Sequence, residues 1–518
     1  MSQMNTPTRI AITRLLPVLV IALTLLLSAT AYAAAPGVQG TNFALTAAPA
    51  FISQPDGGVI YSWGYACSGG GTAAPAGIAP TIGSACGGVM QVPGPTLIVT
   101  EGQTVTVTLT NNLPAAAGNT SILFSGFQVT TGGSGVAGLL TREAAHAGTV
   151  TYTFPTTGKA GTHAYYSGTQ GDLQVEMGLY GAIIVLPLGG GNAACNAVSS
   201  TLPDGQPDYR LASSAYDHAA TCYDREYLFQ FSEIDPKIHR QAEEQADLAC
   251  TIPSGCMQVA TEPYHPAYFM INGRSMPDDM DPNYAPQYPH QPYNGNPHMH
   301  PGEQVLLRVI GTGRWQHPFH EHGNHVRILG RDGNLILSST DATRLAGPLL
   351  FTTTTTPGLA MDGIFYWTGK GLNWDVYGHK PGDGSTCTAD ANGYNTSSPS
   401  APNYYEWCAD HNKPLETHPF GTVGSGGPVT LPDPNILADG PWYGGSPYLG
   451  PDATGKAVSP SPIPPSGTVA NDPGSEAGFA FMWHSHNERE ITTNNIFPGG
   501  MMMMMLVDPQ AYTINESN

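Results

Sequence analysis

The chain has little charge and few basic residues. Only 11% of its 518 residues are charged, and 19 Lys and Arg stand against 39 Asp and Glu, for a formal net charge of -20 at pH 7. Proteins that bind nucleic acid through its phosphates need a basic patch, and this sequence contains no basic block. The composition excludes nucleic acid as a partner and predicts an acidic, well-solvated surface.

Long hydrophobic runs are absent after residue 35. The one marked run, "LLPVLVIALTLLL" at 15–27, follows Arg9 and Arg14 and precedes small residues near Ala33. It is too short for a membrane span and has the arrangement of an export signal. We expect a signal peptide at 1–33 and a secreted protein that is periplasmic, extracellular or at the cell surface, without a membrane segment after cleavage. A retained N-terminal anchor is the alternative.

C-x-x-C spacings are also missing, which argues against a cysteine metal site. An even number of cysteines in an exported chain favours disulfides that staple loops. Pairing in sequence order is our prediction, although other connectivities stay open: Cys67 with Cys86, Cys195 with Cys222, Cys250 with Cys256 and Cys387 with Cys408.

The chain is rich in turn formers, with 63 Gly and 46 Pro, and this favours an all-β fold. Alternating strands such as "TVTVTLTN" and "GTVTYTFP" predict an N-terminal β-sandwich domain at 37–190. A linker is predicted at 191–224 and a second sandwich at 225–510. A Gly/Pro/Ser-rich stretch at about 380–475 reads as a long insertion in this second domain.

Histidines are concentrated in two strings, "HPFHEHGNH" from 317 and "WHSH" from 483. Residues i and i+2 of a strand point to the same face, so His320 and His322 form one pair of imidazoles and His484 and His486 another. A single pair would be an ordinary polar strand face. Two pairs on adjacent strands, with His317 nearby, predict a copper or zinc site.

Five segments resemble the multicopper oxidase family, and they occur in the family's order in both halves of the chain. The resemblance implies cupredoxin-like Greek-key domains and copper-dependent oxidoreductase chemistry. The segments are "VPGPTLIVTEGQTVTVTLTNNLP" (92–114), "GLYGAIIVLP" (178–187), "YFMINGRSMPD" (268–278), "HPFHEHG" (317–323) and "MWHSH", which is followed by "GGMM".

Several ligands that the resemblance implies are missing, because other residue types occupy their positions. The N-terminal His-x-His pairs are replaced at Leu123 and Ser125, and at Tyr166 and Gly168. The type 1 copper keeps its first histidine, His317, but Ser485 stands in place of the cysteine and Glu490 in place of the second histidine. A serine hydroxyl is neither soft nor ionised near neutral pH, so a four-electron laccase-type cycle is not expected.

The five methionines at 501–505 have two interpretations. Thioethers are soft copper(I) ligands. On a strand, however, at most three of the five side chains share a face, and the family closes its barrel with an apolar strand here. We therefore interpret the run mainly as a core strand. His298 and His300, in "HMHPGEQ", are expected to be surface loop residues.

The sequence thus predicts an exported, multicopper-oxidase-like protein with a reduced copper or zinc site. This site would use His320, His322, His484 and His486, with His317 beside them. Its substrate would be a metal ion or a phenol. The competing prediction is a non-catalytic scaffold or metal-binding protein that retains the fold, with no bound metal as the limiting case. A homo-oligomer or an assembly at a cell surface stays open.

Overall fold

The computed structural model describes residues 35–75, 87–202, 207–370, 384–409, 445–448, 478–510 and 512–514. The predicted signal peptide, Cys86 and most of the predicted insertion lie outside these residues. Within the described part, no helix has the length and apolar character needed to cross a membrane.

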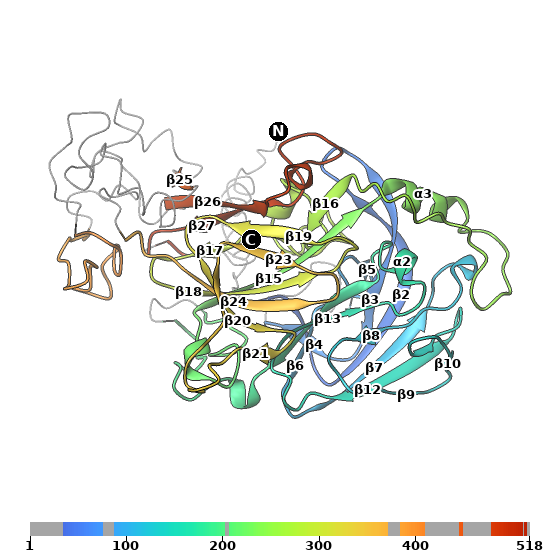
Figure 1. Cartoon of the computed structure of the whole chain (residues 1–518), viewed down its shortest axis with the longest axis horizontal. Helices are drawn as coiled ribbons and strands as arrows, with labels where there is room; N and C mark the ends of the chain where they lie inside the picture. The colour runs from blue at the N-terminus through green and yellow to red at the C-terminus, as the bar shows by residue number, and fades with distance from the viewer. Residues whose placement is uncertain are drawn as a thin grey trace, which may run out of the picture.

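The N-terminal half forms two six-stranded sheets, which we call the N-terminal unit (Figure 1). One sheet has the order β4 (Thr72–Ala74), β1 (Gly37–Gln39), β6 (Leu97–Thr100), β14 (Tyr180–Leu186), β13 (Gly161–Tyr166) and β8 (Leu123–Phe124). The other has the order β5 (Met90–Gln91), β3 (Val59–Gly69), β2 (Asn42–Ser53), β7 (Thr104–Asn111), β12 (Thr149–Pro155) and β9 (Thr130–Gly132). A separate ribbon pairs β10 (Val136–Ala137) with β11 (Arg142–Glu143).

Strand β7 illustrates why these segments fold as strands. Val105, Val107 and Leu109 are fully buried, while the threonines between them lie on the other face. Thr106 and Thr108 face Thr153 and Thr151 of β12, with hydroxyl oxygens 3.3 Å apart in both pairs. Apolar residues at every second position thus fix which face of the sheet enters the core.

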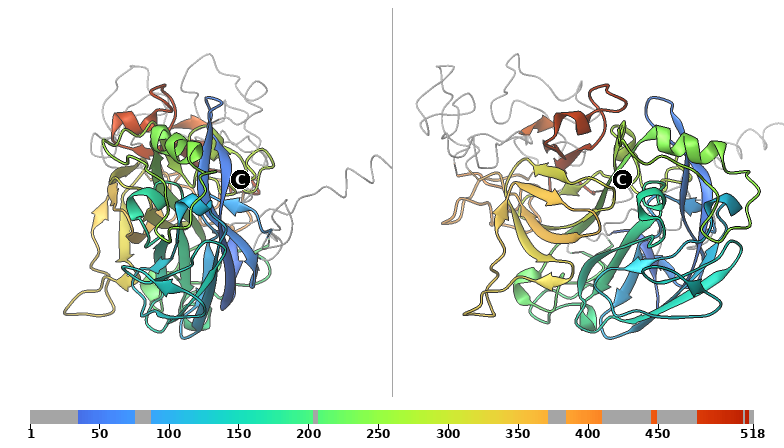
Figure 2. Two further views of the ribbon diagram at one scale, coloured as in Figure 1. Left: turned by 90° about the vertical axis from the view of Figure 1, so that its right-hand side faces the viewer. Right: turned by 45° about the vertical axis from the view of Figure 1, so that its right-hand side comes forward.

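The C-terminal half forms two further sheets, the C-terminal unit, which lies beside the first (Figure 2). One has the order β16 (Tyr268–Ile271), β15 (Arg225–Ile234), β18 (Gln304–Gly311), β24 (Ala360–Tyr366), β20 (Val326–Arg331) and β21 (Asn334–Leu335), and β22 (Leu349–Leu350) also pairs with β20. The other has the order β17 (His298–Met299), β27 (Met502–Val507), β26 (Gly478–Ser485), β19 (His317–Glu321) and β23 (Thr352–Thr355), and β25 (Gly445–Tyr448) also pairs with β26.

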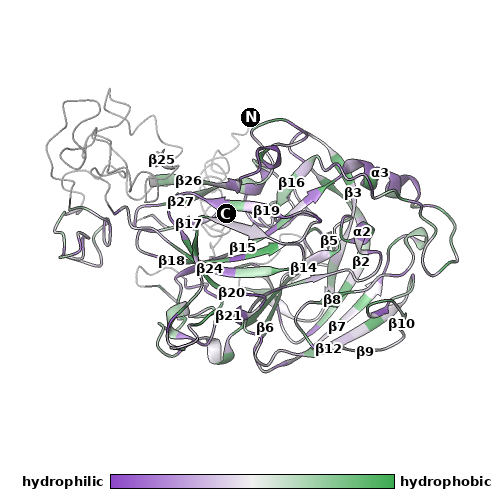
Figure 3. Cartoon of the chain, viewed as in Figure 1, coloured by the Kyte–Doolittle hydropathy of each residue, from purple (hydrophilic) through white to green (hydrophobic). Residues whose placement is uncertain are grey.

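Helices are few and short in the part of the chain that the structure describes. The longest, α3 (Pro236–Glu244), begins where the Asp235 carboxylate accepts a hydrogen bond from the backbone of Lys237, with proline at the first helical position. Figure 3 shows polar colour along α3 and apolar colour on β15 and β18. The others are α2 (Gly171–Gln174) and the 3-10 turns η1 (Ala115–Ala117), η2 (Leu188–Gly190), η3 (Ala219–Thr221), η4 (Asp278–Met280) and η5 (Glu488–Ile491). The all-β prediction is confirmed.

The two units share buried contacts. Ala164 and Ile184 of the first pack in one apolar cluster with Leu228 and Ile310 of the second. A hydrogen bond crosses beside this cluster, because the Thr162 hydroxyl donates to an Asp362 carboxylate oxygen at 2.6 Å.

Three disulfides staple the described loops: Cys195–Cys222, Cys250–Cys256 and Cys387–Cys408. They follow the predicted sequence-order pairing. The fourth predicted pair involves Cys86, which lies outside the described residues.

Candidate metal centre

The strand register brings the two histidine pairs together. In the antiparallel pairing of β19 with β26, His320 lies directly opposite His484. Nε2 of His484 lies 3.2 Å from Nε2 of His322. One ring nitrogen from each of His320, His322 and His484 fits within a span of 4.8 Å, and this is the group of potential metal ligands found in the described part of the chain.

His486 stands at the edge of this group. Its ring centroid lies 4.8 Å from that of His320 and 5.7 Å from that of His484. His320 and His484 are buried, His322 is half-buried and His486 is exposed. The cluster therefore has a closed inner side and an open outer side, and a metal held there would keep access to a ligand from solution.

Burial and the neighbouring histidines favour the neutral form of His320 and of His484. Desolvation, followed by the neighbouring histidines, lowers the pKa of His320 to about 4. Burial also lowers the pKa of His484. At neutral pH neither ring carries a proton on both nitrogens, so each has a lone pair available for a cation.

Hydrogen bonds set the orientation of two of the rings. Nδ1 of His484 lies 2.7 Å from the backbone oxygen of Ser485. A carbonyl only accepts, so Nδ1 carries the proton and the lone pair lies on Nε2, which faces His322. Nδ1 of His320 lies 2.7 Å from the Thr352 hydroxyl on β23. Such outer contacts hold metal-binding imidazoles in place, and the donor set fits copper or zinc.

His317 lies on the other face of β19. His317 is three residues from His320, and residues an odd number of positions apart on a strand point to opposite faces, so its side chain points into the unit. Its Nδ1 lies 2.9 Å from Oε2 of Glu490, and its Nε2 lies 2.9 Å from Oε2 of Glu233. These carboxylates overcome the effect of burial and raise the pKa of His317 to about 9. Both nitrogens of this imidazolium are engaged, so His317 does not join the other histidines.

The remaining type 1 positions complete this inward-facing group. The Ser485 hydroxyl donates to Glu490 at 2.5 Å, and the Asn487 amide donates to the other oxygen of Glu490 at 2.9 Å. Glu490 is almost fully buried. Its position after the strand would suit a surface ion pair with Arg489 or Arg327, but both of these guanidinium groups donate to backbone carbonyls instead. These side chains do not fit a type 1 copper.

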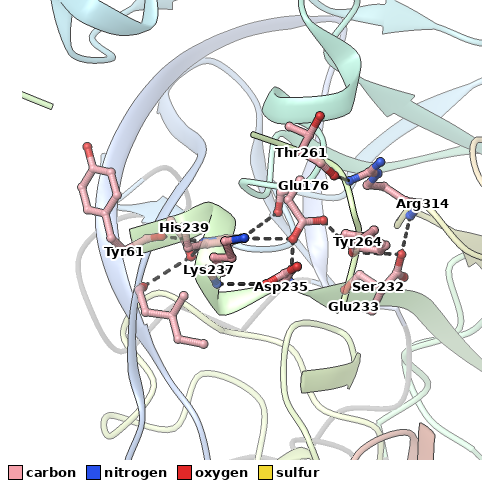
Figure 4. A network of polar contacts seen from close by, with 12 residues as sticks. Tyr61, Glu176, Ser232, Glu233, Asp235, Lys237, His239, Thr261, Tyr264 and Arg314 are labelled. Atoms are coloured by element: carbon pink, nitrogen blue, oxygen red, sulfur yellow. Dashed lines mark hydrogen bonds and ion pairs between the residues drawn. The ribbon is translucent and has the colours of Figure 1, made fainter. Parts of the chain in front are cut away.

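Glu233 extends the network toward the N-terminal unit (Figure 4). Its Oε1 accepts hydrogen bonds from the backbone nitrogens of Arg314 at 2.6 Å and Trp315 at 2.8 Å. The Tyr264 hydroxyl lies 2.6 Å from Oε2 of Glu176 and 3.3 Å from Oε1 of Glu233. Burial raises the pKa of Glu176 to about 8. Sequence reasoning missed Glu176, Glu233 and Tyr264, since no motif marks them.

The replaced N-terminal positions form contacts of their own. Leu123 pairs with Tyr166 across β8 and β13, and the Ser125 hydroxyl donates to the Tyr166 hydroxyl at 3.0 Å. The Leu123 side chain packs over Gly168. Leu123, Tyr166 and Gly168 line a cavity of about 300 Å³. None of these side chains supplies an imidazole nitrogen, so this half of the family's ligand set is absent.

His298 and His300 are buried, contrary to our expectation of surface loop residues. Nδ1 of His298 lies 2.7 Å from an Asp508 carboxylate oxygen, and His300 lies between Glu303 and the backbone oxygen of Tyr512. They belong to the packing around β17 rather than to the histidine cluster.

Comparison with known proteins finds one family match, within the N-terminal half of the chain. Residues 84–189 match the multicopper oxidase family model. None of the curated proteins compared with the chain matches it. Among solved structures, the blue copper oxidase from Nitrosomonas europaea has 16% identity and a TM-score of 0.44, over 90% of this chain and 85% of that chain.

Two other solved structures are similar at the same low level. The multicopper oxidase mgLAC has 16% identity and a TM-score of 0.44, over 92% of this chain and 88% of that chain. The copper nitrite reductase from Nitrosomonas europaea has 18% identity and a TM-score of 0.38, over 64% of this chain and 85% of that chain.

Proposed function

We propose that the protein, whose residues 84–189 match the multicopper oxidase family model, is an exported metal-binding protein that holds copper in its C-terminal unit. The ligands are His320, His322 and His484, with His486 beside them. The observation that carries this proposal is the convergence of three imidazole nitrogens within 4.8 Å. Zinc is the other metal that such a nitrogen set accepts.

The open outer side of the cluster supports an oxidoreductase role. Bound copper would supply one-electron chemistry there. The protein would keep His320 and His484 neutral and oriented, and half-buried His322 and exposed His486 would leave room for a small reductant such as a phenol or a metal ion. A laccase-type cycle is not part of the proposal, because the type 1 position holds a hydrogen-bonded network instead.

A non-catalytic role is the second candidate, and the same network favours it. The two ring nitrogens of His317 pair with the carboxylates of Glu233 and Glu490. The positions that would receive electrons in the family therefore hold a buried ion-pair network in this protein. In this role the protein would bind metal, or retain the fold alone, as a scaffold outside the cell.

Metal analysis of the purified protein tests the proposal. We expect about one equivalent of copper after loading, no strong blue thiolate band, and loss of the metal in the double variant His484→Ala/His486→Ala. His265→Ala, which removes an exposed histidine outside the cluster, is the control and should bind copper as the unchanged protein does. Unchanged copper content in the double variant would refute the site.

Oxygen consumption separates the two candidates. Copper-loaded protein that takes up oxygen in the presence of a phenol or ferrous iron, with no uptake by the double variant, supports the enzyme. Stoichiometric copper without oxygen uptake supports the non-catalytic metal-binding protein.

A further inference from the structure

The methionine run at 501–505, which enters β27 at Met502, presents sulfur to both faces of its sheet. Met501, Met503 and Met505 belong to the core cluster of the C-terminal unit. Met502 and Met504 are not members of that cluster, and strand alternation places them on the opposite face. The core-strand interpretation therefore accounts for three of the five side chains and leaves two to explain.

The register places the outward methionines beside the histidines. Met502 lies directly opposite His484 across β27 and β26, and His484 lies opposite His320 across β26 and β19. Directly opposed residues of an antiparallel pair share a face, with Cβ atoms about 4.5–5.5 Å apart. One row across three strands thus contains a thioether and two imidazoles.

The neighbouring row repeats the arrangement. Met504 lies opposite Met482, which is two residues from His484 and therefore on the same face. His322 has the same relation to His320. A further sulfur, that of Met280, lies 3.4 Å from the backbone nitrogen of Met504. We call Met482, Met502 and Met504 the outward methionines.

Their exposure does not match simple core packing. Met482 and Met504 are only partly buried, and Met502 is buried next to the histidine cluster rather than in the core. Mixed imidazole and thioether donors are typical of sites that select copper(I), because thioethers are soft ligands, whereas zinc has no comparable preference for thioether sulfur.

We propose that the site takes copper as copper(I), with the Met502 thioether as a ligand beside His484 and His322, and with Met482 and Met504 as further sulfur donors along the same face. This inference rests on the proposed histidine site and adds the oxidation state and the sulfur ligand to it.

The test replaces the outward methionines by leucine, which has a similar volume. The triple variant Met482→Leu/Met502→Leu/Met504→Leu should bind copper(I) about 10-fold more weakly or worse, measured anaerobically by competition with bicinchoninate, and should bind zinc unchanged. Its copper X-ray absorption spectrum should lose the sulfur signal of the unchanged protein. Met502→Leu alone should account for most of the loss.

The matched control lies in the same run of five methionines. Met501→Leu/Met503→Leu/Met505→Leu changes only the inward sulfurs and should leave copper(I) affinity unaltered. If the outward triple variant binds copper(I) as tightly as the unchanged protein, the inference is wrong. If the triple variant does not fold, the same criterion applies to Met502→Leu. The histidine proposal fails separately, when His484→Ala/His486→Ala retains both metals.

Discussion

Nδ1 of His317 lies 2.9 Å from Oε2 of Glu490, and these two residues occupy positions where the family resemblance implies the two histidine ligands of a type 1 copper. Glu233 binds the other ring nitrogen at the same distance. A proton shared among one imidazole and two carboxylates thus lies where the resemblance implies a metal ion. The group of potential metal ligands found in the described part of the chain lies on the opposite face of β19.

Replacing His317 should destabilise the protein without changing its metal content. His317→Gln leaves Glu233 and Glu490 buried without their cation, and breaking a buried ion pair in this way costs roughly 3–5 kcal/mol. Chemical denaturation would measure the loss, and copper analysis of the folded variant should match the unchanged protein. A loss of copper with unchanged stability would place His317 among the ligands.

The stability of the metal-free protein should fall at alkaline pH. The folded-state pKa of His317 is raised from 6.5 to about 9, so its contribution is fully present below 6.5 and is lost as the pH rises through about 9. The full shift corresponds to roughly 3 kcal/mol. Glu176, with its pKa raised to about 8 by burial, disfavours the folded state in the same direction from pH 4.5 upward.

Denaturation curves at pH 6, 7.5 and 9 check this expectation. The free energy of unfolding should decrease across the series, and the difference between the unchanged protein and His317→Gln should shrink toward pH 9. Parallel curves for the two proteins would show that His317 does not hold an additional proton in the folded state.

Two buried glutamates should respond in opposite ways to conversion into glutamine. Burial holds the pKa of Glu321 well above its usual value, and Thr353 donates one hydrogen bond to it at 2.9 Å. Burial therefore favours the neutral acid in the folded state, and Glu321→Gln, which is also neutral, should leave stability at pH 7 equal or higher.

Glu233→Gln is the matched comparison. Glu233 accepts hydrogen bonds from two backbone nitrogens and binds His317, so loss of its charge should cost roughly 3 kcal/mol. Thermal and denaturant unfolding of both variants at pH 7 would measure the contrast. Equal losses would contradict the assigned protonation of Glu321.

Removal of disulfides should weaken the protein according to loop length. Cys195 and Cys222 are separated by 27 positions, and Cys250 and Cys256 by 6. Loop-closure entropy predicts losses of about 3.5 and about 2.2 kcal/mol for the paired serine variants. Neither pair contacts the histidine cluster, so both variants should retain copper when folded. A larger loss for the shorter loop would point to native-state contacts rather than chain entropy.

The alternation of residue types along strands predicted the bounds of β7 and the shared face of each histidine pair. The segment "TVTVTLTN" became β7 with its predicted boundaries, and the spacing of His320 with His322 and of His484 with His486 placed each pair on one face. By contrast, the strand-like segment at 121–130 supplies only the two-residue β8 and the first residue of β9. The long strands β2 and β3 lie before the first segment that we predicted as a strand, so the sequence analysis missed them.

The buried network of His317, Glu233 and Glu490 could not be predicted from the sequence. Glu233 lies 84 positions before His317, and Glu490 lies 173 positions after it. Charged residues so far apart show no local pattern that distinguishes a buried pair from two solvated side chains. The chain therefore reveals that the type 1 ligands are missing, and only the folded arrangement reveals what replaces them.

The alternation of inward and outward side chains along the methionine run also determines which methionines peroxide would oxidise first. Met501 and Met503 are fully shielded, whereas Met482 and Met504 are partly accessible to peroxide. Conversion of a thioether to its sulfoxide introduces a polar oxygen and weakens the soft donor. Oxidation would begin at the outward methionines and leave the buried core methionines intact, so the protein would lose its sulfur ligands well before it unfolds.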